Sequence, residues 1–322
     1  MRRLAKHEGY GNFLFEEVPI PSITANQVLV KTHTSLISRG SEILARYRKE
    51  APVNPASMGY SVAGTIVEAG DAAQAAGNAP GDRVFASTPH AEYTVAEIGD
   101  EARLLKVPAD LTWEQVPFIA LARGGVAWAI ASDAKPTDTV VVLGQGLVGN
   151  LVMQAHRARG AGRVIAVDSL DLRVRVSREC GADVVVHAGQ VEPVAEVKRL
   201  TGGKGADVVV DCVGGPPGLQ SFQQAQDMVR TFGTIHLIGL YHGQPLALDS
   251  GKIQRKKLIG GYYLTEPLGP LSVRAADLIA GGQVRVDPMI THRFPAEQAP
   301  GAFALLDQHP DQAFAVLLEW PQ

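Results

Sequence analysis

Thr139-Val-Val-Val-Leu-Gly-Gln-Gly-Leu-Val-Gly149 joins an apolar run to three closely spaced glycines, and Asp168 follows nineteen residues after the last of them. The apolar run predicts a buried strand, and the glycines predict a tight turn into a helix at 150–159. Gly144 would make the turn, Gly146 would let the backbone approach a pyrophosphate, and Gly149 would let the helix pack on the strand. The pattern therefore predicts a dinucleotide-binding turn, although a glycine-rich turn in an unrelated α/β protein would look similar.

Asp168 ends a second predicted strand, residues 163–168. A carboxylate at that position can accept hydrogen bonds from ribose hydroxyls, and its charge repels a 2′-phosphate. A hydrogen bond to a charged group contributes about 1.5–3 kcal/mol, or about 10- to 150-fold in affinity. Asp168 therefore predicts a preference for NAD(H). Arg173 and Arg175 keep NADP(H) possible, because they could pair with the extra phosphate.

The composition is that of an ordinary globular protein. The chain has 322 residues, 46% of them apolar and 20% charged, and its formal net charge is −3. This length allows two domains, and the charge predicts no surface for nucleic acid or for a membrane. No run approaches 18 apolar residues, and the first residues lack the apolar core of a signal peptide. The two cysteines, Cys180 and Cys212, exclude a disulfide framework and favour a cytoplasmic location.

The spacing of apolar residues changes along the chain. Short alternating runs before residue 115 predict a partly open β-barrel, with a small-residue loop at 72–79. From residue 139 onward, short apolar strands alternate with helices, which predicts a doubly wound parallel sheet. The predicted strands are 13–18, 27–33, 61–67, 82–87, 91–95, 140–143, 164–167, 184–186, 206–211, 234–238, 290–294 and 312–319, and the predicted helices are 113–132, 150–159, 171–180, 191–200, 218–228, 270–280 and 296–306.

Further motifs surround the glycine turn: Gly-Thr-Ile-Val-Glu-Ala-Gly at 64–70, Gly-Asp-Arg-Val at 81–84, His-Ala-Glu-Tyr-Thr-Val at 90–95, Leu-Lys-Val-Pro-Ala-Asp-Leu at 105–111 and Gly-Thr-Ile-His-Leu-Ile-Gly at 233–239. With a mid-chain fingerprint, this order resembles the medium-chain dehydrogenase/reductase family across the chain. The resemblance implies a GroES-like catalytic domain at 1–117 and 266–322 and a Rossmann domain at 118–265. It also implies a homodimer paired through an edge strand near 234–240.

Zinc members of that family carry Cys-Gly-Ser-Asp-x-His and Gly-His-Glu motifs. Here the matching segments read Ile-Ser-Arg-Gly-Ser-Glu at 37–42 and Gly-Tyr-Ser at 59–61, so Arg39, Tyr60 and Ser61 stand at ligand positions. Residues 120–124 supply no third ligand, and the four-cysteine lobe is absent. Because a zinc site needs three to four N, S or O ligands, we expect no metal. The segment is similar to zinc-lacking bacteriochlorophyllide hydroxyethyl dehydrogenases and to sugar or cyclitol dehydrogenases.

Three side chains are candidates to stabilise an alkoxide in place of zinc. Ser41 matches the hydroxyl that relays the proton in zinc relatives, Tyr60 replaces a ligand, and His90 lies on a segment that lines the pocket in the family. Each also has a structural interpretation. Ser41 could cap a helix from residue 43, Tyr60 could simply pack, and His90 could be a core histidine. Arg39 could bind an anionic substrate group or pair with Glu42.

The resemblance also implies a set of cofactor-binding residues: Gly144, Gly146, Leu147, Val148, Gly149, Asp168, Ser169, Arg173, Cys212, Val213, Ile238, Gly239, Leu240 and Tyr262. Tyr262 has ordinary packing as its alternative. The nicotinamide itself is expected in the cleft between the two domains.

These features predict a zinc-independent, NAD(H)-dependent oxidoreductase that interconverts a secondary alcohol and a ketone or aldehyde, with a sugar, cyclitol or other small molecule as substrate. Two alternatives stay open. One is an NAD(P)H-dependent enone or quinone reductase, against which Asp168 and the segment 37–42 argue. The other is a non-catalytic dinucleotide-binding protein, against which the polar residues at 41, 60 and 90 argue.

Overall fold

A computed structural model describes residues 1–241 and 243–322 of the chain. The chain forms two compact units. The first consists of Met1–Arg123, Pro267–Gly282 and Met289–Gln322, and the second consists of Gly124–Glu266 and Gln283–Pro288. Both chain ends therefore belong to the first unit, and the glycine turn belongs to the second.

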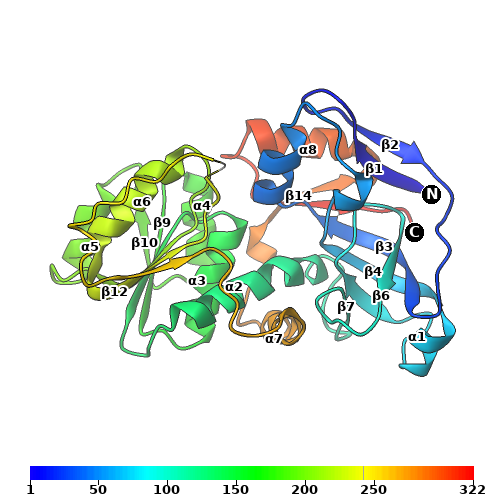
Figure 1. Ribbon diagram of the computed structural model, residues 1–322, viewed down its shortest axis with the longest axis horizontal. Helices are drawn as coiled ribbons and strands as arrows, with labels where there is room; N and C mark the ends of the chain where they lie inside the picture. The colour runs from blue at the N-terminus through cyan, green and yellow to red at the C-terminus, as the bar shows by residue number, and fades with distance from the viewer. Residues whose placement is uncertain (242) are drawn as a thin grey trace. The chain divides into compact units, whose positions relative to one another are not determined.

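The first unit contains a seven-stranded sheet (Figure 1). Its path is β14 (Ile290–Pro295), β15 (Ala315–Glu319), β3 (Gln27–Leu36), β4 (Val62–Ala69), β5 (Arg83–Ala86) and β7 (Leu104–Lys106), with β6 (Tyr93–Glu97) paired to β3; β1 (Arg2–Lys6) and β2 (Phe13–Glu17) form a separate hairpin. The β3 strand is central because it pairs antiparallel with β4, β6 and β15. Val28, Val30, Val62 and Val84 form part of the core of this sheet.

The first unit also contains several helical segments. They are η1 (Arg39–Tyr47), η2 (Pro55–Ser57), α1 (Asp71–Ala75), η3 (Val116–Phe118), α7 (Leu268–Ala280), η5 (Ala296–Gln298) and α8 (Ala299–Gln308). The short η4 (Asp287–Met289) spans the boundary between the two units. The α2 helix (Ile119–Ser132) begins in this unit and continues into the second. Helix η1 is a π-helix. Its Ile43 and Tyr47 pack in one buried apolar cluster with Phe303 and Leu306 of α8. These contacts hold η1 against α8.

The second unit is a doubly wound parallel sheet. Its strand order is β10 (Val184–His187), β9 (Arg163–Asp168), β8 (Thr139–Leu143), β11 (Ala206–Asp211), β12 (Val229–Leu237) and β13 (Lys257–Gly260). Every pairing is parallel, and the order reverses between β8 and β11. The connecting helices are α3 (Leu147–Ala158), α4 (Asp171–Glu179), α5 (Pro193–Leu200) and α6 (Pro217–Met228) (Figure 1). The predicted α/β fold class is confirmed, and ligands bind such sheets at the carboxyl edge where the order reverses.

Several predicted elements need correction. The strand near 234–240 is not the edge of the sheet, because β13 pairs with β12 and takes that place. The short β13 follows a polar, basic stretch, which hid it in the sequence. Residues 71–75 form helix α1 inside the predicted loop, and β1 and β7 were missed. Helical structure starts at Val116, not at residue 113. Within the described residues, no helix has both the length and the apolar character needed to cross a membrane.

Candidate active site

The glycine turn has the close packing that its spacing predicts. Gly144 has φ +81°, and a Cβ there would lie 2.7 Å from Cγ2 of Val213. A Cβ on Gly149 would overlap the carbonyl oxygen of Gly144, so α3 sits directly against the turn. Gly146 is the N-cap of α3, and nothing lies within 4 Å of its missing Cβ. No side chain caps α3, so the N–H groups of its first turn, from Leu147 and Val148, remain available for a phosphate.

Asp168 lies beside this turn at the end of β9. Its Oδ2 accepts the backbone N–H of Gln145 at 2.7 Å, and its Oδ1 accepts that of Leu170 at 3.0 Å. The guanidinium of Arg173 is 3.4 Å from Oδ2, whereas Ser169 is exposed. An ionised carboxylate has about four acceptor positions, so Asp168 keeps capacity for one further donor. The turn and the acid, far apart in sequence, are held by a direct hydrogen bond.

The other predicted cofactor residues meet at the strand-order reversal. Cys212 and Val213 follow β11, and a Cβ on Gly239 would overlap the carbonyl oxygen of Val213. Ile238 is buried, and Leu240 is exposed. Tyr262 lies apart from this set, with its ring packed edge-on against Trp128 at 5.1 Å between centroids. The structure thus brings together the segments at 144–149, 212–213 and 238–239.

Asp211 was missed by the sequence interpretation, although it holds this edge together. Its Oδ1 accepts the Ser221 hydroxyl at 2.7 Å and the Val213 N–H at 3.2 Å, and its Oδ2 accepts the Tyr241 hydroxyl at 2.6 Å. Burial raises the pKa of the Asp211 carboxyl, and these hydrogen bonds oppose that rise. The signal available was an acid at the carboxyl end of an otherwise apolar strand.

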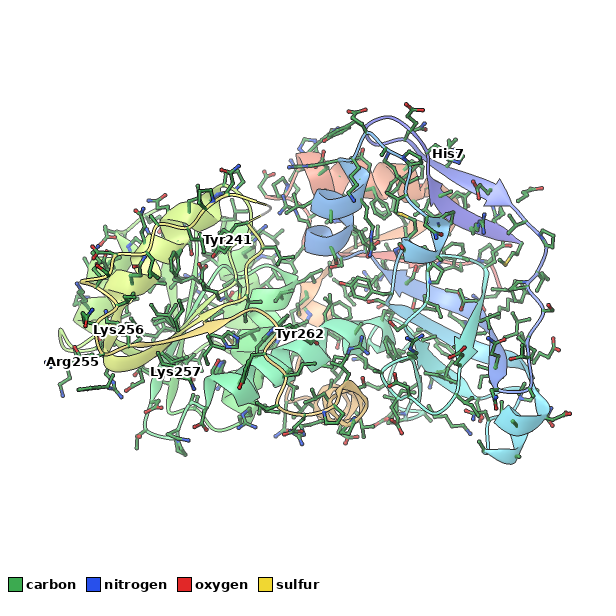
Figure 2. The ribbon with its side chains drawn as sticks, in the orientation of Figure 1. His7, Tyr241, Arg255, Lys256, Lys257 and Tyr262 are labelled. Atoms are coloured by element: carbon green, nitrogen blue, oxygen red, sulfur yellow. The ribbon has the colours of Figure 1, made fainter. Side chains whose placement is uncertain are left out.

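Figure 2 shows that the basic run Arg255, Lys256 and Lys257 lies away from this carboxyl edge of the sheet. Tyr241 follows β12, and Tyr262 follows β13, so both lie toward the carboxyl ends of these strands. Arg255, Lys256 and Lys257 gather instead where β13 begins. The basic run therefore belongs to the opposite edge of the sheet and does not contribute to the dinucleotide site.

The first unit holds a second candidate site, built on three hydroxyls. The Ser41 hydroxyl donates to Oγ of Ser38 at 2.8 Å, and its oxygen lies 2.8 Å from the Tyr60 hydroxyl. Ser41 lies inside η1, whose N-cap is Ser38, so Ser41 does not cap a helix from residue 43. Burial and the Glu42 charge raise the pKa of Tyr60, and hydrogen bonds from Ser38 and Ser41 oppose the rise. Since an ordinary tyrosine has a pKa of about 10, Tyr60 is a neutral phenol at physiological pH.

Glu42, which follows Ser41 in the chain, forms a fully buried, hydrogen-bonded pair with His90. Nε2 of His90 is 2.8 Å from Oε2 of Glu42, and Nδ1 is 2.8 Å from the Ser35 hydroxyl. That hydroxyl also accepts the Trp320 indole N–H at 2.9 Å. Both ring nitrogens are therefore occupied. We reassign His90 from a candidate donor to the substrate to a residue that positions Glu42.

Glu42 connects this pair to the hydroxyls. Its Oε1 accepts the backbone N–H of Ser38, the N-cap of η1, at 3.0 Å. A capping box places the acid three residues after the serine, and Glu42 follows Ser38 by four, so this bond had no recognised signal in the sequence. Removing one partner of a buried hydrogen bond leaves the other group unsatisfied, which costs about 1–3 kcal/mol. Glu42 and His90 thus fix where η1 begins and where Ser41 lies.

Gly59 sets the approach of Tyr60. Its φ is +106°, and a Cβ there would lie 2.8 Å from Cδ2 of His90. The backbone N–H of His90 donates to the carbonyl of Met58 at 2.6 Å. This hydrogen bond joins the segment 58–60 to the buried histidine. The Ser61 hydroxyl is buried and has no hydrogen-bond partner among the described residues. A left-handed glycine packed on His90 therefore orients the phenol toward Ser41.

The side chains at the positions of the family's zinc ligands do not form a metal site. Arg39 donates from Nε to the carbonyl of Leu306 at 3.0 Å, Tyr60 is bonded to Ser41, and Ser61 offers only a hydroxyl. Among the residues that the structure describes, no three His, Cys, Asp or Glu side chains gather as metal ligands would. A zinc site needs three or four such donors, and two side chains of a suitable type, Glu42 and His90, are bonded to each other. These residues do not fit a catalytic zinc.

Comparison with known proteins gives consistent matches. A family model described as zinc-binding dehydrogenase matches residues 148–267. The chain is 26% identical to L-threonine 3-dehydrogenase of Bacillus subtilis (strain 168) over 95% of each protein. It is 27% identical to sorbitol dehydrogenase 1 of Saccharomyces cerevisiae, over 98% of this chain and 97% of the relative. An Escherichia coli oxidoreductase/dehydrogenase of unknown specificity shares the fold over the full length of both chains, with a TM-score of 0.88 and 20% identity.

The chain joins a doubly wound sheet with a glycine turn to a mostly antiparallel sheet. Together with these relatives, this indicates an oxidoreductase of the dehydrogenase class. More narrowly, the comparisons support the medium-chain, zinc-type alcohol dehydrogenase-like family, and its solved members share the fold of this chain. The family predicted from the sequence is confirmed.

Proposed function

We propose that this protein interconverts a secondary alcohol and a ketone or aldehyde with NAD(H), without zinc. The observation that supports the proposal is the hydroxyl cluster of Ser38, Ser41 and Tyr60, which comes from the two segments that match the zinc-ligand motifs of the family in the sequence. A sugar, cyclitol or similar biosynthetic intermediate is the substrate class that the sequence resemblance favours.

Hydride transfer to a carbonyl carbon leaves negative charge on its oxygen, and a bound nicotinamide supplies that hydride. One well-placed donor to such an oxygen lowers the barrier by about 2.7–4 kcal/mol. Tyr60 suits this role because its raised pKa keeps the phenol protonated. The Tyr60 proton moves to the substrate oxygen, the Ser41 hydroxyl, 2.8 Å away, can rotate to donate to the resulting phenolate, and a proton from solvent restores the phenol. Oxidation of an alcohol runs through the same hydroxyls in reverse.

We propose NAD(H) over NADP(H) on the geometry of Asp168. Its nearly buried carboxylate retains acceptor capacity for a ribose hydroxyl and would repel a 2′-phosphate. Arg173, which could otherwise pair with that phosphate, lies 3.4 Å from the same carboxylate. The residues of the glycine turn and of the segments at 212–213 and 238–240 are the proposed contacts of the dinucleotide, and Tyr262 is a proposed contact of the nicotinamide.

We also propose a homodimer, now paired through β13. This strand has one unpaired edge, and its Leu258 side chain is 45% exposed. Phe232 of the neighbouring β12 is 72% exposed. Exposed apolar side chains on an open strand edge favour pairing with another chain. Light scattering should give twice the chain mass, and Leu258→Asp should shift it to a monomer. A monomeric wild-type protein would contradict the proposal.

The reaction is tested with NADH and a panel of ketones, enones and quinones, followed by product identification. Reduction of C=O should dominate, and the double variant Tyr60→Phe/Ser41→Ala should lose about 10²- to 10³-fold in kcat, the effect of removing one oxyanion donor. Tyr10→Phe is the matched control, because its hydroxyl bonds Asp307 away from this cluster. Products of C=C reduction would favour the enone reductase, and no turnover by wild type would favour a binding protein. One tightly bound zinc per chain would refute the metal-free mechanism.

A further inference from the structure

Helix η1 carries a second polar side chain in register with Ser41. A π-helix bonds residue i to i+5, and the Arg48 N–H donates to the Ile43 carbonyl at 3.2 Å in this manner. Residues five apart are therefore one turn apart and lie on roughly the same side of the helix. Arg46 follows Ser41 by five residues. In an ordinary α-helix the same spacing would place these two residues on different sides.

The Arg46 guanidinium is buried in part, and one of its nitrogens has no partner among the described residues. Its Nη1 is inaccessible to solvent and has no hydrogen-bond partner among the residues that the structure describes. The neighbouring arginines differ. Arg39 donates to the Leu306 carbonyl, and Arg48 pairs with Asp307 at 2.6 Å. A guanidinium remains charged at every physiological pH, and a buried donor without an acceptor is costly. The position of Arg46 is therefore explained best by an acceptor that the described residues do not supply.

The charge of Arg46 acts on the hydroxyl cluster. Its guanidinium lowers the pKa of the Tyr60 phenol, against the larger effects of burial and of the Glu42 charge. Glu42 is bonded to the Ser38 N–H and to His90, and no ion pair joins it to Arg46 among the described residues. The cluster thus combines hydroxyls that can serve an alcohol oxygen with a positive charge that no described carboxylate neutralises.

We propose that Arg46 binds an anionic group of the substrate, a carboxylate or a phosphate, while Tyr60 and Ser41 hold its reacting oxygen. The substrate class is then a hydroxy acid or a phosphorylated polyol, together with the corresponding carbonyl compound. The planar guanidinium suits both groups because it can donate two parallel hydrogen bonds to either. This inference rests on the proposed alcohol–carbonyl reaction.

Matched substrate pairs test the proposal with NAD⁺: 3-hydroxybutyrate against butan-2-ol for the carboxylate, and glycerol 1-phosphate against propane-1,2-diol for the phosphate. Wild type should prefer the anionic member of at least one pair. Arg46→Met should lose about 10- to 150-fold in kcat/KM on that anionic member, as expected for a hydrogen bond to a charged group, with little change on the neutral one. Arg46→Lys should recover part of the loss. Arg48→Met, which loses only the Asp307 pair, should preserve the preference.

An equal loss on charged and neutral members would overturn the proposal, because Arg46 would then only support the helix. Weaker NADH binding by Arg46→Met, without a change in the charge preference, would also overturn it by assigning Arg46 to the cofactor phosphates. If wild type oxidises no member of either pair, calorimetry of the NADH complex with 3-hydroxybutyrate and with glycerol 1-phosphate decides. Binding lost in Arg46→Met would uphold the anion site and refute the reaction, whereas no binding by wild type would refute the anion site.

Discussion

Replacing Asp168 by asparagine should convert a preference for NADH into indifference or a preference for NADPH. The asparagine keeps the size of the side chain, but one oxygen becomes an N–H₂ group. That group cannot accept the N–H of Gln145 or Leu170, and the charge that repels a 2′-phosphate is gone. Arg173, which lies 3.4 Å from the carboxylate, is released to meet a phosphate. The perturbation therefore weakens one cofactor and favours the other.

The magnitude follows from the lost charged hydrogen bond, about 1.5–3 kcal/mol, which raises the Kd for NADH about 10- to 150-fold. The Kd for NADPH should fall. Fluorescence titration of the purified protein with each cofactor measures both constants without any substrate. Thermal unfolding without cofactor shows separately how much of the effect comes from the backbone hydrogen bonds of Asp168.

Asp171→Asn is the matched control. It removes a carboxylate three residues further along, on a side chain that is 94% exposed and bonded only to His187 among the described residues. Both cofactor constants should stay within about twofold, as expected for a screened surface pair. An unchanged NADH-to-NADPH ratio in Asp168→Asn, or a wild type that already binds NADPH more tightly, would refute the role given to Asp168.

Three further predictions concern other parts of the molecule. Gly149→Ala should destabilise the fold by about 1–3 kcal/mol and abolish NADH binding, because its Cβ would overlap the Gly144 carbonyl; Gly146→Ala should weaken NADH binding while the melting temperature stays unchanged. His156 is buried in α3 with a pKa lowered to about 3 by burial and by neighbouring positive charge, whereas it titrates near 6.5 when unfolded. The contribution of His156 to stability is therefore present above pH 6.5 and is lost as the pH drops toward 3, by about 2 kcal/mol between pH 7 and 5. In urea unfolding at these two pH values, the free energy of unfolding of His156→Phe should fall by about 2 kcal/mol less than that of wild type. The same pH dependence in both proteins would contradict the lowered pKa of His156. In Glu42→Gln, the basic limb of the reduction profile should move to lower pH, because the Glu42 charge raises the pKa of Tyr60; a shift to higher pH would count against Tyr60 as the proton donor.

The sequence predicted well wherever function depends on local geometry. The glycine spacing at 144–149 and the acid at 168 specify a turn and its neighbour, because a turn is decided by the few residues that form it. Alternation of short apolar strands with helices specified the parallel sheet for the same reason. The edge strand was misplaced, because β13 has four residues and gains its identity only by pairing with β12.

The hydroxyl cluster was predicted in part. Ser41 and Tyr60 stood out by their positions in two motifs, and the structure places their oxygens 2.8 Å apart. Ser38 did not stand out, since its role depends on a hydrogen bond from Ser41 within the same helix turn. For His90 a pocket role and a core role stayed open, because the sequence shows a histidine near a pocket-lining motif but not which groups bond its two nitrogens.

The sequence by itself determined the class of fold, the dinucleotide turn and the absence of zinc-ligand residue types at their usual places, since each depends on residue identity and short spacing. Only the tertiary structure decided which side chains meet where the family's zinc ligands would be. Trp320, Ser35, His90 and Glu42 come from distant parts of the chain and meet through hydrogen bonds that no spacing encodes. The π-helical winding of η1, which places Arg46 in register with Ser41, is a further decision of packing, because propensities scarcely distinguish a π-helix from an α-helix.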